Sequence, residues 1–500
     1  MMRSRKTTWA AFAACAFFCC SCTIGPKYQA PTAPVAPSFK EFRGNDEWKM
    51  ATPSDGALKG QWWEMFGDPQ LNRLEEMVSV NNQNIKQSEA QFRQAQTTIL
   101  ANRANYYPTI GSTPSITQTD VGKSTGRGFG TSQSFSLPVT TTWEPDLWGR
   151  VRLAVQNAVD NAQVNAADLE NLRLSQEALL ATDYFLLAAE DMQMAILTDT
   201  IQAYEKNLQL TINRFGGGVA SKSDITLAQT QLDGAKAQFT DAHIARAQYE
   251  HAIAVLTGQA PSAIEIAPTK IAAPPPPIPL GLPSTLLERR PDIAASERQV
   301  AAANANIGIA QTAYYPTLTL SATPGFLATN LANLFLYSAR TWSAGPSLSQ
   351  TLFDFGRRGA AVASAQASYD ATAASYRQTV LAAFQEVEDD LASLRYLAEE
   401  AGQQKEAVTA ALLALDLENE RYKAGTDSYL NVIQTQTIAL SDQQTEVTIL
   451  QRRMTAAVDL IKALGGGWDA SRLPSGDVMR KTSTQAVPAN THEVARANGN

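Results

Sequence analysis

The strongest constraint on this chain is an internal repeat with an offset of about 207 residues. In each copy an Ala-rich segment ends in Tyr-Tyr-Pro, at Tyr106–Pro108 and at Tyr314–Pro316, and extended segments then lead to a Gly-Arg pair that begins at Gly149 or at Gly356. Proline excludes the α conformation from the residue before it, so each helix should end at this motif. A repeat of this length predicts an elongated body of two similar halves instead of several globular domains.

The repeat sets the domain boundaries. We predict a signal peptide, an extended arm, a first repeat, a linker, a second repeat and a tail, in that order: 1–21, 22–60, 61–257, 258–283, 284–468 and 469–500. The linker contains Pro274–Pro277 and should be stiff. The tail is polar and has no hydrophobic period, which predicts that it is disordered.

Two pairs of segments alternate as strands do, at about 109–119 and 134–143, and at about 317–328 and 341–352. In the segment 134–143, Phe135 and Leu137 alternate with small polar residues, which gives one apolar and one mostly polar face. Each segment is about 10–12 residues long, which suits a tilted transmembrane strand. Four strands cannot close a membrane barrel, so strands that span a membrane would require at least two copies of the chain. A small soluble sheet is the alternative.

Very long helices follow each Gly-Arg pair. We predict long helices over 151–213 and 358–422, and returning helices over 223–256 and 429–464. The first long helix would extend roughly 95 Å at 1.5 Å per residue. In the second, Val380, Val387 and Leu394 lie on a seam with steps of four and three, which is typical of a coiled coil. A compact helical bundle is the alternative, but this length favours a bridge across a compartment.

Composition excludes several functions. The net charge is −7, and removal of residues 1–21 takes away three basic residues and leaves −10, which disfavours nucleic acid as a partner. His243 and His251 have no third ligand nearby in the sequence, and no Ser/His/Asp arrangement or phosphate-binding loop is present. We therefore predict no enzyme activity, no catalytic residue, no metal site and no cofactor.

A cluster of acidic residues lies on the second long helix: Glu386, Glu388, Asp389 and Asp390. Such a cluster is usually a solvated helix face, and the functional alternative is the lining of a water-filled tunnel. Beyond the N-terminus there is no apolar run of about 20 residues, so no transmembrane helix is predicted.

Several motifs occur in a fixed order: Gly281-Leu282-Pro283-Ser284, Arg289-Arg290-Pro291-Asp292-Ile293, Ala303-Asn304-Ala305 and Tyr315-Pro316. Together they resemble the outer membrane factors of the TolC family, in particular the lipoprotein branch that forms the outer-membrane channel of tripartite efflux pumps. The resemblance covers roughly Cys22 to Trp468. It implies a mostly α fold with a membrane β-barrel, in which three copies build one 12-stranded barrel and a periplasmic α-barrel.

The resemblance also implies where the protein is and what it binds. Its place would be the outer membrane of a Gram-negative bacterium, where the homotrimer contacts outer-membrane lipid and extends into the periplasm. Its partners would be a periplasmic adaptor protein and an inner-membrane pump of the RND type. Its function would be a passive exit duct for drugs, toxic compounds or metal ions. The alternatives are the channel of a type I protein secretion system and a periplasmic coiled-coil scaffold.

The N-terminus is similar to the start of that lipoprotein branch. A basic segment precedes an apolar run from Trp9 to Phe18, as in a secretory signal. All four cysteines, Cys15, Cys19, Cys20 and Cys22, lie here, so the body has no disulfide and no Cys-based metal site. The resemblance implies that Cys22 is the lipidated residue after cleavage. Cys15 is a rival site, and a plain signal peptide with a free thiol is the other alternative.

Matched turns follow the two long helices, at 214–221 and 421–428. In the family these turns form the periplasmic tip, which implies that Gly218, Val219, Gly425 and Thr426 contact the adaptor. TolC has two aspartates that ring its constriction at the start of the second returning helix, and the matching positions here are Asn431 and Gln434. Asp427 lies close to these positions and could substitute for the missing aspartates, and Asp224 lies at the equivalent of an aspartate in the first copy. The gate candidates are therefore Asp224, Asp427, Asn431 and Gln434.

Overall fold

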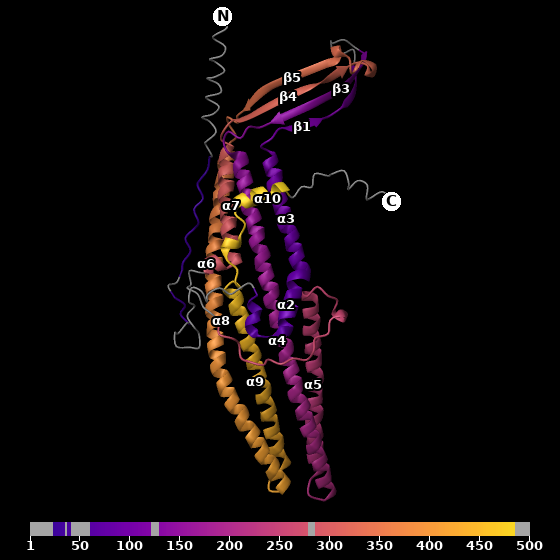
Figure 1. Cartoon of the computed structure of the whole chain (residues 1–500), viewed down its shortest axis with the longest axis vertical. Helices are drawn as coiled ribbons and strands as arrows, with labels where there is room; N and C mark the ends of the chain where they lie inside the picture. The colour runs from indigo at the N-terminus through magenta and orange to yellow at the C-terminus, as the bar shows by residue number, and fades with distance from the viewer. Residues whose placement is uncertain (1–23, 36–37, 42–60, 122–129, 279–285, 486–500) are drawn as a thin grey trace.

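The structure is a computed structural model that describes residues 24–35, 38–41, 61–121, 130–278 and 286–485. Figure 1 shows an elongated molecule with an antiparallel sheet at one end and helices along its length. At the other end two turns each join a pair of antiparallel helices. The order of strands, long helix and returning helix occurs twice, which confirms the two predicted repeats.

Two very long helices carry this architecture. α4 (Arg150–Gly216, 67 residues) and α8 (Arg357–Ala424, 68 residues) each extend about 100 Å at 1.5 Å per residue. Their first halves pack against α3 (Gln83–Ala104) and α7 (Pro291–Thr312), and their second halves pack against α5 (Lys222–Leu256) and α9 (Tyr429–Ala463). The predicted bounds of the long and returning helices are correct to within three residues.

The first halves of the helices form a row in the order α3, α4, α7, α8, because α4 packs against both α3 and α7, and α7 packs against α8. In the second halves α4 packs with α5, α8 packs with α9, and α9 also contacts α4. The predicted coiled-coil seam is confirmed, since Val380, Val387 and Leu394 are all buried. α3 and α8 therefore end the row on opposite edges of the chain.

The sheet continues this order. β1 (Thr109–Ser112) and β2 (Ser115–Val121) pair with β3 (Gly130–Trp143), which pairs with β4 (Thr317–Ala328), which pairs with β5 (Arg340–Ser349). All pairings are antiparallel. The edge strands β1/β2 and β5 thus belong to the same two edges as α3 and α8.

Three predicted strand bounds are wrong. The strand expected over 134–143 begins at Gly130, because its first residues pair with the end of β2, Gly130 opposite Val121. The strand expected over 109–119 is divided into β1 and β2 at Pro114, which lacks the N–H that a ladder needs. The strand expected over 341–352 ends at Ser349, because the chain then turns into α8, where Asp354 accepts hydrogen bonds from the N–H groups of Gly356 and Arg358.

In each repeat, two helices meet end to end beside a long helix. In the first repeat Asn82 caps α3 through the N–H groups of Asn84 and Ile85, and its Nδ2 donates to the carbonyl of Leu256 at the end of α5, 2.9 Å away. Gly258, with φ of 72°, passes so close to Asn81 that a Cβ would lie 2.5 Å from its carbonyl oxygen.

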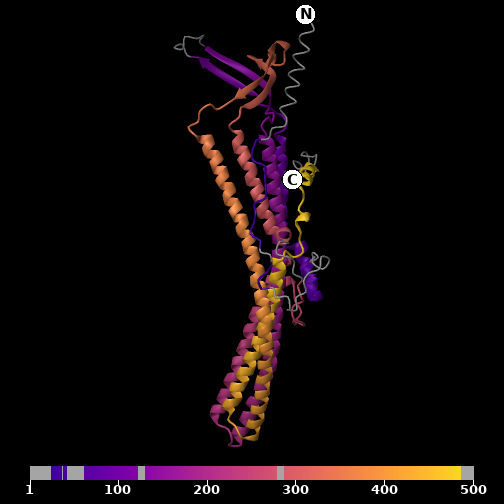
Figure 2. The same ribbon diagram turned by 90° about the vertical axis from the view of Figure 1, so that its left-hand side faces the viewer.

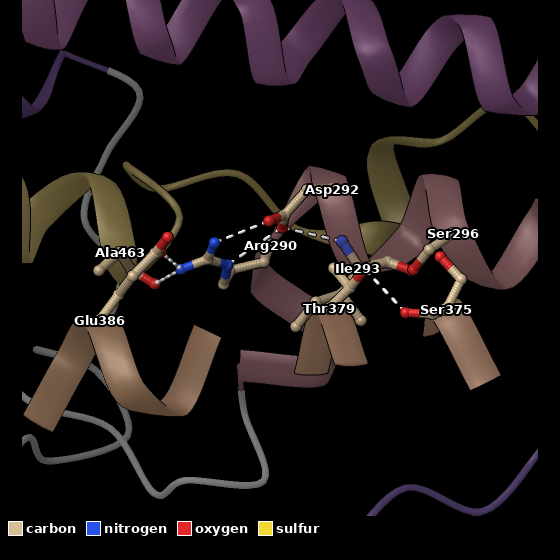
Figure 3. Close-up of polar contacts among 8 residues, drawn as sticks. All are labelled: Arg290, Asp292, Ile293, Ser296, Ser375, Thr379, Glu386 and Ala463. Carbon is tan, nitrogen blue, oxygen red and sulfur yellow. Dashed lines mark hydrogen bonds and ion pairs between the residues drawn. The ribbon is translucent and has the colours of Figure 1, made fainter. Parts of the chain in front are cut away.

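The second repeat builds the same joint with charged groups (Figure 3). Arg290 lies before α7 and donates to the carbonyl of Ala463 at the end of α9 (3.1 Å), to both carboxylate oxygens of Asp292 (3.0 and 2.7 Å) and to Glu386 on α8 (2.7 Å). Gly465, with φ of 93°, is pressed against Arg289. The family motif Arg289–Ile293 therefore ties three helices together.

The middle of the molecule is thickened by a hydrophobic cluster. It includes Trp62 and Trp63 from the short helix η2 (Trp62–Phe66), residues of α2 (Pro69–Asn81), and Ile266 and Ile278 of the linker. Arg246 of α5 binds Asp191 of α4 (2.6 Å) and the carbonyl of Ile266 (2.7 Å). Residues 258–278 of the linker therefore wrap around this level of the helices.

The tail is not disordered throughout, so this prediction is wrong for residues 469–485. It contains η8 (Ala470–Arg472) and α10 (Gly476–Gln485), which packs against α3 and α4. In Figure 2 the tail, in yellow, lies along one side of the upper helices, away from α8 in orange. Trp468, directly before the tail, and Met479 within it are buried (6% and 1% exposed), and two anchors so far apart give no periodic pattern. Residues 486–500 lie outside the described part.

Two members of the acidic cluster on α8 make structural contacts. Glu386 pairs with Arg290, and Glu388 accepts hydrogen bonds from the backbone N–H groups of Lys40 and Glu41 in the N-terminal arm (2.7 and 3.0 Å). Burial, and next the nearby Asp459, raise the pKa of Asp390 to about 7. The cluster is thus not simply a solvated face.

Candidate functional site

The turns at the end of the long helices lie at the pole of the molecule opposite the sheet (Figure 1). α4 ends at Gly216 and Gly218 has φ of 78°, and α8 ends at Ala424 and Gly425 has φ of 76°. Glycine adopts this left-handed conformation without strain, so the chain can reverse its direction directly after each long helix. All four residues expected to contact an adaptor, Gly218, Val219, Gly425 and Thr426, are exposed here.

The structure gives the gate candidates different local roles. Asp224 and Ser221 form a capping box at the start of α5, with the Ser221 N–H 2.8 Å from the Asp224 carboxylate. Asp427 accepts hydrogen bonds from the Ser428 N–H (2.7 Å) and from Asn431 Nδ2 (2.6 Å). The Ser428 N–H lowers the pKa of the Asp427 carboxyl, which therefore stays ionised. Gln434 is exposed one turn beyond Asn431.

A lock between the two turns was not predicted from the sequence. Arg214, at the end of α4, donates through Nη1 to the carbonyls of Tyr422 (2.5 Å) and Lys423 (3.2 Å) at the end of α8. Its guanidinium also lies 4.5 Å from the centre of the Tyr422 ring. A cation is stabilised at the carbonyl end of a helix and on an aromatic face, so this contact joins the two hairpins.

Buried tyrosines extend the lock inwards. Thr211 Oγ1 lies 3.3 Å from the Tyr422 hydroxyl, and the rings of Tyr422 and Tyr429 are 5.2 Å apart. Burial raises the pKa of Tyr429, so its hydroxyl stays protonated at neutral pH. The sequence shows an arginine before each turn, Arg214 and Arg421, but not what either of them binds. Arg421 binds Glu418 on its own helix (2.7 Å) and does not bridge the hairpins.

At the other pole the N-terminal arm reaches the junction between sheet and helices. The Ile24 N–H donates to the carbonyl of Trp148 (3.3 Å), between β3 and α4. Gly25 passes over Gly308 of α7 so closely that a Cβ on Gly25 would lie 2.8 Å from the Gly308 Cα. Cys22 and Cys15 lie outside the described residues.

A groove between α3 and α4 is lined by neutral polar groups, among them Gln94, Thr98, Asn102, Asn157 and Asn161. The opposite side of the same helices is covered by α10, whose Gly476 lies against Val159. Within the described residues, no group of three or more metal-ligating side chains is found. The same part of the chain contains no helix whose length and apolarity would allow it to span a bilayer.

Comparisons with known proteins agree with this geometry. The model of the family described as outer membrane efflux protein matches residues 75–259 and 282–466, which are the two repeats. Two relatives from Pseudomonas putida, the antibiotic efflux pump outer membrane protein ArpC and the toluene efflux pump outer membrane protein TtgC, are each 30% identical over 462 residues. These alignments cover 91% of this chain and 94% of each relative.

Solved structures show the same architecture. The outer-membrane channel OprN has a TM-score of 0.82 at 28% identity, with 89% of this chain and 100% of that chain covered. The CmeC outer membrane channel of Campylobacter jejuni has a TM-score of 0.84 at 21% identity, with 94% and 99% covered, and supports the fold alone.

The fold and the paired turns thus define the class, a two-repeat outer-membrane channel subunit. The chain belongs to the outer membrane efflux protein family. It is an outer-membrane efflux channel that extends into the periplasm, and its family consists of efflux ducts and is not an enzyme family. The efflux relatives favour this function over the protein-secretion and scaffold alternatives.

Proposed function

We propose that three copies of this chain form the passive exit duct of a tripartite efflux system for small organic molecules. The observation that carries the proposal is a single open-edged layer, formed by the sheet and the first halves of the long helices. It has β1/β2 and α3 on one edge and β5 and α8 on the other. An open strand edge in lipid leaves backbone groups unpaired at several kcal/mol each, so the edges of neighbouring copies must join. Three copies would contribute 12 strands, counting β1 and β2 as one.

The two sides of α3 and α4 differ in polarity and in what covers them, and this difference indicates which side lines the duct. One side carries α10 and the buried Met479, whereas the other is the groove lined by Gln94, Asn102, Asn157 and Asn161. Neutral amides hydrate well without holding either sign of charge, which suits passage of varied solutes. Antibiotics and toluene, named for ArpC and TtgC, define the class of substrate that we propose.

The turns would be the periplasmic tip. We propose that Gly218, Val219, Gly425 and Thr426 meet a periplasmic adaptor, with an inner-membrane pump of the RND type as the source of energy. Val219 is 69% exposed and Phe215, on the same turn, is 46% exposed, so this turn offers apolar surface to an adaptor. Opening would separate the two hairpins, and this separation breaks the Arg214 lock. Asp427 and Asn431 would lie beside the constriction.

We further propose lipidation at Cys22. Ile24 is fixed at the Trp148 carbonyl, so Cys22 is at most about 7 Å of chain away from the junction of sheet and helices. Acyl chains attached there would enter the membrane at the base of the sheet. From Cys15 the same junction is nine residues away.

Transport and assembly test this proposal together. A deletion strain complemented with the intact chain should accumulate less of a fluorescent efflux substrate than the uncomplemented strain, and only when adaptor and pump genes are present. Light scattering on protein extracted from outer membranes should give the mass of three chains. A monomer in the soluble fraction, or accumulation that complementation leaves unchanged, would refute the proposed duct.

A further inference from the structure

The starting point is an aromatic contact between the two repeats within one chain. Trp148, at the passage from β3 to α4, lies on Tyr315 at the passage from α7 to β4, with ring centres 4.9 Å apart. Its Nε1 also donates to the carbonyl of Pro316 (2.7 Å). This contact closes the seam between neighbouring elements at the level where the sheet meets the helices.

The repeat assigns an equivalent to each partner. The two hairpins have the same register, Thr109 opposite Thr142 and Thr317 opposite Ser349, so the offset is 208 residues for the first strand and 207 for the second. With these offsets Trp148 corresponds to Phe355. Tyr315 and Pro316 correspond to Tyr107 and Pro108.

These equivalents have no contact with each other inside one chain, because they lie on opposite edges. Phe355 precedes α8 and is 91% exposed, and Tyr107 follows α3 and is 70% exposed. Phe355 has φ of 52°, the only positive φ of a non-glycine residue among those described. Its ring centre lies 4.4 Å from that of Phe353, which is also exposed. Strained backbone of this kind persists where the surroundings stabilise it.

We infer that Phe355 packs on Tyr107 and Pro108 of the partner subunit. This contact between two copies would be equivalent to the contact of Trp148 with Tyr315 and Pro316 within one chain. The interface between subunits would then resemble the interface between the two repeats. This inference rests on the proposed trimer and names the residues that would join it. The partner is a second copy of this chain.

A second pair on the same seam supports the assignment. Within the chain Gly308 of α7 leaves room for Leu153 of α4, since a Cβ on Gly308 would lie 2.8 Å from the Leu153 Cδ1. The equivalents are Leu100 on α3 and Ala360 on α8. The large and the small residue have exchanged helices, so the combined size is kept. Ala360 is exposed and Leu100 half-buried in the single chain, as expected for residues that await a partner.

Cross-linking in the full chain tests the contact. Tyr107→Cys/Phe355→Cys protein, in outer membranes, is treated with a short bis-maleimide and separated under denaturing conditions. We expect most of the chain to move as linked dimers and trimers, while each single-cysteine variant stays at one chain. Phe335 is also 70% exposed but lies in the connection between β4 and β5, at the far end of the sheet. Tyr107→Cys/Phe335→Cys is therefore the matched control and should stay at one chain.

Two further readouts separate the possible failures. Leu100→Cys/Ala360→Cys should link the same copies lower on the seam, which guards against local misfolding at the junction. A trimer by light scattering that neither pair can link would overturn the inferred contact, leave the trimer intact and assign Phe353 and Phe355 to the lipid interface. Absence of any trimer would overturn both the contact and the proposed assembly.

Discussion

At the scale of single residues, equal sequence positions in the two repeats have acquired different roles. Arg214 and Arg421 both precede a turn, yet only Arg214 bridges to the other hairpin, whereas Arg421 binds Glu418 on its own helix. The sequence predicted the turns and the exposed tip residues. It could not predict the lock, because the partner of Arg214 is a pair of backbone carbonyls and these leave no signature in the sequence.

The lock gives a direct prediction for channel opening. Arg214→Ala removes two charge-assisted hydrogen bonds, each of about 1.5–3 kcal/mol, and a cation–π contact between the two hairpins. We expect a larger single-channel conductance in planar bilayers than the unchanged chain shows. Arg421→Ala is the matched control and should keep the original conductance. Equal conductance of both variants would show that the bridge does not restrict the tip.

A buried carboxyl predicts a dependence of stability on pH. Burial is the main cause that raises the pKa of Glu177 from 4.5 to about 7, although the Trp62 indole donates to it (3.4 Å) and so lowers it. Between these two values the folded chain binds more protons than the unfolded chain, so the free energy of unfolding falls as pH rises. The loss is complete above about pH 7 and corresponds to about 3 kcal/mol.

Replacement of the Glu177 carboxyl tests whether the free energy of unfolding falls with rising pH because of this group. Glu177→Gln keeps an acceptor for the Trp62 indole and removes the ionisable group, so the variant should melt several degrees higher than the parent at pH 8 and nearly equally at pH 4.5. Glu76→Gln alters an exposed residue of the same helix layer and serves as control. A parent whose stability does not fall between pH 5 and pH 8 would contradict the assignment.

At the scale of elements, helix lengths and turn positions followed from the sequence, but the joints did not. Periodicity locates α3, α5, α7 and α9 separately, whereas their end-to-end contacts depend on Asn82 and Arg290 bonding to carbonyls about 170 residues away. The tail was missed for a similar reason. Its few anchors, Trp468 and Met479, are too widely spaced to form a helical or strand period.

The joint of the second repeat predicts an unusually sensitive glycine. Gly465 and Gly356 have nearly the same φ, 93° and 88°, but a Cβ on Gly465 would lie 2.0 Å from the Arg289 carbonyl oxygen while a Cβ on Gly356 meets nothing within 4 Å. Gly356→Ala should therefore cost only the backbone strain, about 1–2 kcal/mol. Gly465→Ala must in addition push the end of α9 away from Arg289, which lies just before α7. We expect its midpoint of thermal unfolding, followed by helical circular dichroism, to fall well below that of Gly356→Ala, and equal midpoints would exclude the clash.

At the scale of the whole molecule, the repeat and the alternation of the strands were enough to predict a two-repeat body with a sheet at one end and turns at the other. The order of the elements within the layer was not predictable, since α4 must contact both α3 and α7, and this depends on packing across the repeats. That order places both open edges of sheet and helices on the same sides, and it is the basis for assembly from several copies.

The position of the N-terminal arm gives the last prediction. Ile24 bonds to Trp148 and Gly25 fits over Gly308, so an anchor at Cys22 enters the membrane beside the sheet, and an anchor at Cys15 would add seven residues of slack. We therefore expect Cys22→Ser to lose incorporation of labelled palmitate and Cys15→Ser to retain it. Because the shared sheet is a second attachment to the membrane, the Cys22→Ser protein should still fractionate with the outer membrane. Label retained by Cys22→Ser and lost by Cys15→Ser would move the anchor to Cys15.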